Sequence, residues 1–176
     1  MEESFETPPS TGKVALKWGL ILGVVLIIFS LIINMTGNFG NNAIQSISYI
    51  FIIIGIVLAH RDYKQTGDGY MSYGKGLGIG TLTVIIAFAL SGIFGYIYMT
   101  SVDPTLIDQV KEQQMIQYEE QGMSDAQIEQ AMSFTERFMT PGMLSLFGLL
   151  FSAFIGFILS LIISAFTKNS NPELDM

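Results

Sequence analysis

The sequence predicts an all-α membrane protein with four transmembrane helices and an extracytoplasmic helical hairpin between the third and fourth helices. Three observations support this. Half of the 176 residues are hydrophobic and only 13% are charged, about half the charged share of an average soluble domain. The apolar residues gather in four blocks, each near the roughly 20 helical residues that cross a hydrocarbon core. The basic residues lie mostly at one set of block ends.

The four blocks are predicted to span the membrane at about residues 14–35, 43–60, 76–100 and 142–166. Lys17 is the only Asp, Glu, Lys or Arg within these ranges. In the last block apolar residues occur on every side of a helical wheel, and such a helix must be buried in protein or in lipid. A chain of this size cannot bury four of them in protein. Gln45, Ser46 and Ser48 dilute the second block, where a tilted or partly re-entrant helix is the alternative.

The basic residues predict the orientation. With four crossings, six of the eight lysines and arginines fall on one side of the membrane and two on the other. Because basic loops remain in the cytoplasm, both termini are expected there. Residues 1–12, which are acidic and contain two prolines, are expected to form a disordered tail, and residues 169–176 a second tail. The six basic residues on the cytoplasmic side are Lys13, Lys17, Arg61, Lys64, Lys75 and Lys168.

Residues 103–140, between the third and fourth spans, predict a hairpin of two helices. Asp103 and Pro104 suit the start of the first helix, and Gly122 suits its end. Ser124 and Gln127 fit a capping box that begins the second helix. The apolar faces of these helices either pack on each other or lie on the outer leaflet. The alternative is a docking surface for a protein partner, formed by the acidic residues Glu119, Glu120, Glu129 and Glu136.

The membrane blocks lack the residue patterns that intramembrane chemistry needs. Beyond Lys17, no ionisable group is expected at membrane depth, so proton-coupled transport and proteolysis have no residues to carry them. The serines have no base to activate them. His60, the only histidine, is expected at the headgroup boundary where the second span ends, and with Asp62 and Asp68 it forms too small a set for a metal site.

These patterns restrict the classes of partner. The net charge is −7, which argues against a general nucleic-acid binder because such proteins cluster lysine and arginine. There is no cysteine, which excludes disulfides and thiolate-ligated metals. We therefore expect no catalytic residue, no metal and no cofactor. The expected partner is the lipid bilayer, joined by a protein partner at the hairpin or by further copies of the chain.

Small residues at four-residue spacing predict where the helices pack, because they allow backbones to approach closely in lipid. Two glycines open the third span, and a ladder of glycines and serines runs along the fourth. Contacts within one bundle explain this pattern more economically than homodimerisation, which is the alternative. The predicted helix-packing residues are Gly76, Gly80, Gly148, Ser152, Gly156 and Ser160.

The order of several short motifs resembles a known family. The run from Gly69 to Gly74 precedes the third span, and Tyr96-x-Tyr98 with Asp103-Pro104 follows it. The turn from Gly122 to Glu129 and Pro141 before a last span rich in glycine and serine complete the pattern. Over residues 12–168 the chain resembles the bacterial membrane proteins known as domain of unknown function 4199. The resemblance implies a protein of the bacterial cytoplasmic membrane and brings no catalytic residue, cofactor or activity with it.

The sequence thus predicts a non-enzymatic accessory or interaction subunit of the membrane. The alternative is a small oligomeric transporter or channel whose path is uncharged and lined by serine, threonine and glycine. Broken helices at glycine-rich positions are common in such transporters, and the start of the third span has this composition.

Overall fold

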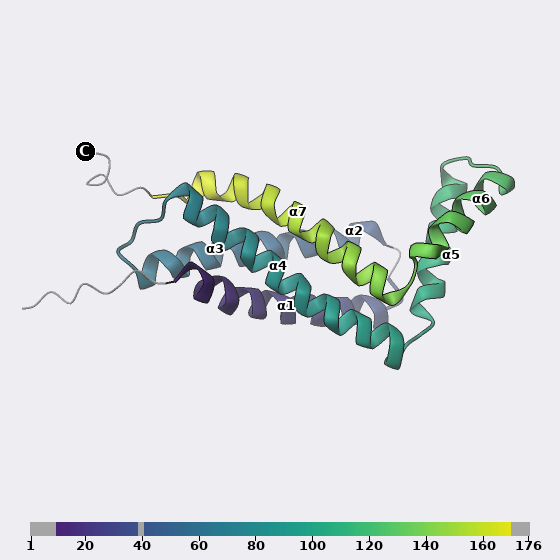
Figure 1. Ribbon diagram of the computed structural model, residues 1–176, viewed down its shortest axis with the longest axis horizontal. Coiled ribbons are helices and arrows are strands. Elements are labelled where there is room, and N and C mark those ends of the chain that lie inside the picture. The colour runs from purple at the N-terminus through teal and green to yellow at the C-terminus, as the bar shows by residue number, and fades with distance from the viewer. Residues whose placement is uncertain (1–9, 39–40, 170–176) are drawn as a thin grey trace, which may run out of the picture. The chain divides into compact units, whose positions relative to one another are not determined.

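The computed structural model describes residues 10–38 and 41–169, and their regular structure is helical (Figure 1). One isolated antiparallel bridge, between Met71 and Asn169, is the only β pairing among the described residues. The predicted tails lie largely outside the described part of the chain. In chain order the elements are α1 (Thr11–Met35), α2 (Asn42–Gln45), α3 (Ile47–Thr66), α4 (Tyr73–Ile97), the π-helical turn η1 (Tyr98–Val102), α5 (Leu106–Glu120), α6 (Asp125–Thr135), the 3-10 turn η2 (Glu136–Phe138) and α7 (Pro141–Thr167).

Four helical segments are long and apolar enough to cross a membrane: Thr11–Met35, Asn42–Thr66, Tyr73–Val102 and Pro141–Thr167. Only 22–28% of the most apolar stretch of each segment is buried within the structure. Most of their apolar side chains therefore face outward. An exposed apolar surface of this size is unfavourable in water, whereas lipid tails can cover it. The predicted all-α fold class is confirmed, and the four helices indicate a multi-pass membrane protein.

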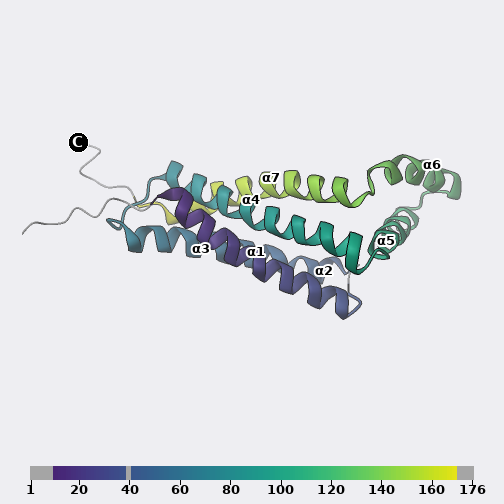
Figure 2. The ribbon, with the colours of Figure 1, turned by 60° about the horizontal axis from the view of Figure 1, so that its bottom comes forward.

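The chain forms two compact units, Met1–Ser91 with Phe151–Met176 and, separately, Gly92–Leu150. The first unit contains α1, α2, α3 and parts of α4 and α7; α1 and α3 lie side by side in it (Figure 2). Three apolar clusters form its core and join side chains from α1, α3, α4 and α7. The clusters are Val14, Ala59, Tyr63, Met71 and Ile79; Ile52, Ile56, Val84 and Ile163; and Leu22, Leu26 and Ala87.

The second predicted span differs from expectation in two ways. Its helix is interrupted at Ser46, one of the polar residues that dilute this block, where φ and ψ stay in the right-handed helical region, so α2 and α3 follow one another within the segment Asn42–Thr66. The Asn41 side chain begins the short α2 by accepting hydrogen bonds from the backbone N–H groups of Ala43 and Ile44, at 3.0 and 3.2 Å. In addition, α3 runs on to Thr66 rather than ending near residue 60. The apolar stripe of α3 continues over that stretch and keeps it packed on the bundle.

The second unit contains the two hairpin helices, α5 and α6. Gly122 follows α5 with a φ of +75°, a left-handed conformation that glycine adopts without strain. The side-chain oxygen of Gln127 accepts a hydrogen bond from the Ser124 N–H at 2.9 Å, which is the reciprocal half of a capping box. Buried apolar side chains hold the unit together. They are Leu106, Ile128, Met132 and Met139.

Both hairpin helices are shorter than the sequence indicates. The Asp103 carboxylate accepts a hydrogen bond from the Thr105 N–H at 3.1 Å, so residues 103–105 form a turn and α5 begins only at Leu106. At the other end α6 stops at Thr135 and tightens into η2 before Pro141 begins α7. Such 3-10 turns are common where a helix ends.

Candidate functional site

A cluster of polar contacts lies where the end of α3 meets α4 and α7, and His60 is at its centre. The His60 side chain is 0% exposed. Its Nε2 lies 2.8 Å from the carbonyl oxygen of Gly76 on α4, and its Nδ1 lies 2.8 Å from the Thr167 hydroxyl on α7. One ring on α3 therefore links three helices. The helix itself continues past His60 to Thr66, so His60 lies within α3 and not at its end.

The hydrogen bonds of His60 determine what it can do chemically. A carbonyl oxygen only accepts, so Nε2 must carry the proton that it donates to Gly76. In the neutral ring Nδ1 can only accept, and the single proton of the Thr167 hydroxyl serves either Nδ1 or the Ile163 carbonyl oxygen, each 2.8 Å from the hydroxyl oxygen. Both ring nitrogens are engaged in contacts between helices, so His60 holds the bundle together and presents no free nitrogen to a ligand. Within the described ranges, no three His, Cys, Asp or Glu side chains gather closely enough to hold a metal ion.

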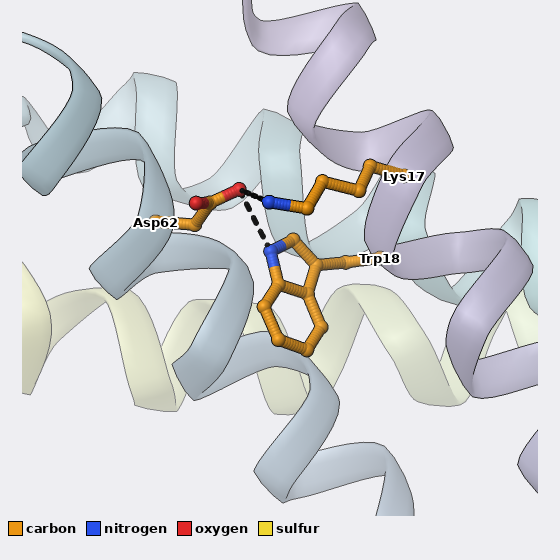
Figure 3. Close-up of polar contacts among 3 residues, drawn as sticks. All are labelled: Lys17, Trp18 and Asp62. Carbon is orange, nitrogen blue, oxygen red and sulfur yellow. Dashed lines mark hydrogen bonds and ion pairs between the residues drawn. The ribbon is translucent and has the colours of Figure 1, made fainter.

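A second polar cluster joins α1 to α3, as Figure 3 shows. The Asp62 carboxylate on α3 accepts hydrogen bonds from the Lys17 ammonium at 2.9 Å and from the Trp18 indole N–H at 3.0 Å, both at the same oxygen. The single lysine of the first apolar block is thereby neutralised by a neighbouring helix. The Lys17 side chain is 55% exposed and that of Asp62 22%, so the pair contributes about 1 kcal/mol or less to stability. Its main effect is to fix α1 against α3.

The segment between α3 and α4 is fastened to the end of α7. Met71, which is 1% exposed, exchanges two backbone hydrogen bonds with Asn169, at 2.8 and 2.9 Å. The Asn169 amide also donates to the carbonyl oxygen of Gly69 at 3.1 Å, and the Lys64 ammonium donates to that of Thr167 at 3.0 Å. The loop that carries the Gly69–Gly74 motif is therefore a structural clasp. This contact could not be predicted from local sequence patterns, because its two partners are about a hundred residues apart in the chain.

Two of the predicted packing glycines of α4 face serines of α7. A Cβ atom added at Gly76 would lie 3.0 Å from the Ser164 hydroxyl oxygen, and one added at Gly80 would collide with the hydroxyl oxygen of Ser160. Both serines are 0% exposed. The backbone of α4 thus approaches α7 as closely as only glycine permits at these two positions.

The ladder of small residues on α7 takes part in this contact over only part of its length. A Cβ atom added at Gly156 would lie 2.7 Å from the Val84 side chain, and Ser152 is 3% exposed. Gly148 differs, because an added Cβ atom would meet no atom within 4 Å. Gly148 therefore does not pack closely on another helix within the described part of this chain. Four-residue spacing identifies a helix face but does not show where a neighbouring helix approaches it.

Four buried hydroxyl groups of α4 and α7 have no hydrogen-bond partner within the described structure. They belong to Thr81, Thr83, Ser160 and Ser164. Ser160 and Ser164 lie against the two glycines of α4, and neither they nor Thr83 hydrogen-bond to the His60 ring, whose two nitrogens are engaged elsewhere. With no base to remove its proton, a serine hydroxyl is a weak nucleophile. The arrangement is that of a tight polar contact between helices.

The acidic residues of the hairpin divide into two groups. Glu136 forms an ion pair with Lys111 of α5, at 3.4 Å, and so belongs partly to the hairpin's own structure. Glu119, Glu120 and Glu129 are exposed, and no ion pair involves them in the described part of the chain. They remain the candidates for contact with another molecule.

Comparison with known proteins identifies a family. No curated protein and no solved structure matches the chain. A family model described as "Protein of unknown function (DUF4199)" matches residues 17–169. The match takes in all four apolar helices and the hairpin, and it confirms the resemblance seen in the short motifs. Since it covers most of the sequence, the chain belongs to this family.

Proposed function

We propose that this protein is a non-enzymatic accessory subunit of the bacterial cytoplasmic membrane, and that it docks a protein partner on its hairpin. One observation carries the proposal. The ionisable side chains of His60, Asp62 and Lys64, at one end of the helical bundle, are engaged in contacts with neighbouring helices. The exposed carboxylates of Glu119, Glu120 and Glu129 form no ion pair with any described residue. Chemistry at membrane depth would require titratable groups that are free to react, whereas docking requires exposed ones.

The orientation follows from the basic residues. Lys17 begins the apolar part of α1, Lys64 lies at the end of α3 and Lys75 at the start of α4. Lys168, after α7, is adjacent to the clasp that joins Met71 and Asn169. Basic residues at one end of a helical bundle favour the cytoplasmic side. Both chain ends then lie in the cytoplasm, and the hairpin lies on the far side of the membrane.

The docking surface consists of Glu119 and Glu120 at the end of α5 and Glu129 on α6. Its partner would carry lysine or arginine on the segment that binds. A single exposed ion pair contributes only about 0.2–1 kcal/mol, so binding requires all three carboxylates together. Exposed pairs are also screened by salt, and the association should weaken as ionic strength rises.

Site-specific photocrosslinking in native membranes tests this function. The photoreactive residue is placed at Gln121, beside Glu120, and at the exposed Ser133, one helical turn after Glu129 on the same side of α6, so that the carboxylates stay intact. Thr105, exposed at the start of α5, serves as the control position. We expect the same protein adduct from both test positions, none from Thr105, and loss of the adduct when the three glutamates become glutamines. Adducts with lipid alone, or a protein adduct unchanged by the glutamine variant, would contradict the proposal.

The second candidate function is a small oligomeric transporter or channel with an uncharged path. The unpartnered hydroxyls of Thr83, Ser160 and Ser164 favour it, because buried polar groups without partners can mark a route for polar solutes. The close approach of Gly80 to Ser160 opposes it, because no solute fits between them. Swelling of proteoliposomes in small neutral solutes such as glycerol separates the two functions. Permeability equal to that of empty vesicles rejects the transporter.

A further inference from the structure

An exposed strip of three phenylalanine rings runs from the hairpin to α7 within the second unit. The rings of Phe134 on α6 and Phe138 on η2 lie 5.5 Å apart between centroids, and those of Phe138 and Phe147 on α7 lie 6.1 Å apart. The side chains of Phe134 and Phe147 are 65% and 49% exposed. We call these three residues the aromatic strip. Neighbouring aromatic side chains that remain exposed to this extent indicate a surface that contacts another molecule or a membrane.

The charged side of α6 is directed away from the aromatic strip. At about 100° per residue, Phe134 lies roughly 140° around the helix from Glu129 and about 180° from Asp125. The buried residues Ile128 and Met132 lie roughly 120° and 160° around the helix from Phe134, beside the charged side, and face the interior of the unit. The exposed residues nearest to Phe134 around the helix are the uncharged Gln127 and Gln130. The exposed carboxylates and the exposed aromatic ring are thus separated on one helix.

Continuity with a membrane helix identifies what covers the aromatic strip. Phe147 belongs to Pro141–Thr167, a segment long and apolar enough to cross a membrane. Only Met139 and Thr140 separate η2 from α7, so Phe138 lies within about 11 Å of the start of that segment along the chain. A strip that begins on a lipid-facing helix and continues without interruption meets the same lipid.

We propose that the aromatic strip binds the bilayer interface on the hairpin side of the membrane. In this arrangement α6 rests its Phe134 side on the lipid and turns Glu129 toward water. The inference rests on the membrane placement given under the proposed function, and it explains how an acidic docking surface is held at a fixed height above the membrane. It also resolves the choice between helix packing and contact with the outer leaflet, because α6 does both with different sides.

Spin labelling tests this inference directly, because the chain has no cysteine and each label needs one substitution. The variants are Phe134→Cys, the matched Glu129→Cys on the same helix, and Phe154→Cys, which is 61% exposed in the apolar part of α7. Each is reconstituted in vesicles of phosphatidylethanolamine and phosphatidylglycerol. Collisions with oxygen, which concentrates in lipid, and with a water-soluble nickel chelate report the environment of each label. We expect the labels at 134 and 154 to favour oxygen at least several-fold more than the label at 129.

The other outcomes overturn defined parts of the account. In one outcome the label at 154 favours oxygen, whereas the label at 134 favours the nickel chelate as the label at 129 does. This outcome overturns the lipid contact of the aromatic strip but leaves the membrane placement of α7 intact. Nickel accessibility at 154 overturns the membrane placement and this inference with it. A label at 134 that is lipid-exposed in vesicles but shielded from both reagents in native membranes shows a protein occupant and overturns the inference.

Because cysteine removes one ring of the strip, Phe134→Trp in a Trp18→Phe background provides a second readout. Its fluorescence should be quenched by lipids brominated near the headgroup, and absence of quenching overturns the inference.

Discussion

The ring of His60 on α3 donates a hydrogen bond to the carbonyl oxygen of Gly76 on α4, with 2.8 Å between the two atoms. Its other nitrogen contacts Thr167 on α7 at the same distance. Neither lipid nor an apolar bundle offers hydrogen-bond partners, so a buried imidazole is stable only if the protein satisfies both nitrogens. His60 therefore has a structural role, because it links α3 to α4 and α7.

Replacing His60 by alanine should destabilise the bundle. The change removes both contacts and opens a cavity at a fully buried position. Losses of this kind amount to about 2–4 kcal/mol. Unfolding in mixed micelles of increasing dodecyl sulfate content measures the change. Arg61→Ala, at the exposed neighbouring position, is the control, and an equal effect of both substitutions would contradict the structural role of the ring.

Replacing Gly80 by alanine should force α4 and α7 apart. The new methyl group would collide with the Ser160 hydroxyl and would lie 3.0 Å from the Ile56 side chain. We expect a loss of about 1–3 kcal/mol, as for other overpacked cores. Gly78→Ala, where nothing lies within 4 Å, should be neutral or slightly stabilising because alanine favours a helix. The same dodecyl sulfate titration compares them.

Two further variants make this prediction sharper. Adding Ser160→Gly to Gly80→Ala removes the colliding hydroxyl and should restore part of the stability, although the contact with Ile56 remains. Gly148→Ala should leave stability unchanged or raised, since an added methyl group meets nothing there. A marked loss at Gly148 would show that the whole ladder of small residues is a contact surface.

The ion pair between Lys17 and Asp62 should contribute modestly to stability. A double-mutant cycle with Lys17→Met and Asp62→Asn should give a coupling free energy below about 1 kcal/mol, because the pair is partly exposed. The coupling should shrink as salt is added. Trp18→Phe, which removes the second donor to the same carboxylate oxygen, should weaken the contact of α1 with α3 even at high salt. A coupling of several kcal/mol would place this pair in a far drier environment than the structure gives it.

The fold class could be predicted because a long apolar block without charges has few alternatives. Helix length, hydropathy and the uneven distribution of lysine and arginine all indicate the same fold, a bundle of four membrane-spanning helices. Local signals in the hairpin were also informative, since Gly122 and the pair Ser124 and Gln127 lie where helices end and begin. These residues act through their own backbone neighbours, and short-range chemistry is readable from sequence.

The burial of the His60 side chain between three helices could not be predicted from the charge pattern. That pattern associates a histidine beside Arg61 with a headgroup boundary. A signal was nevertheless present, because His60 lies four residues after Ile56 and eight after Ile52, on the buried stripe of α3. The hydrogen-bond partners of His60 could not be predicted from the sequence, because Gly76 and Thr167 belong to other helices. The difference between Gly148 and Gly156 was hidden for the same reason, because it depends on where a second helix approaches.

Cysteine labelling of intact cells determines whether the four helices cross the membrane with the hairpin on the outside. Single cysteines replace Ser133 in the hairpin and Asp68 between α3 and α4 in a chain that has none of its own. A maleimide that cannot cross the membrane should label position 133 in intact cells, and position 68 only after the membrane is permeabilised. Labelling of both positions from outside, or of position 68 alone, would contradict the account.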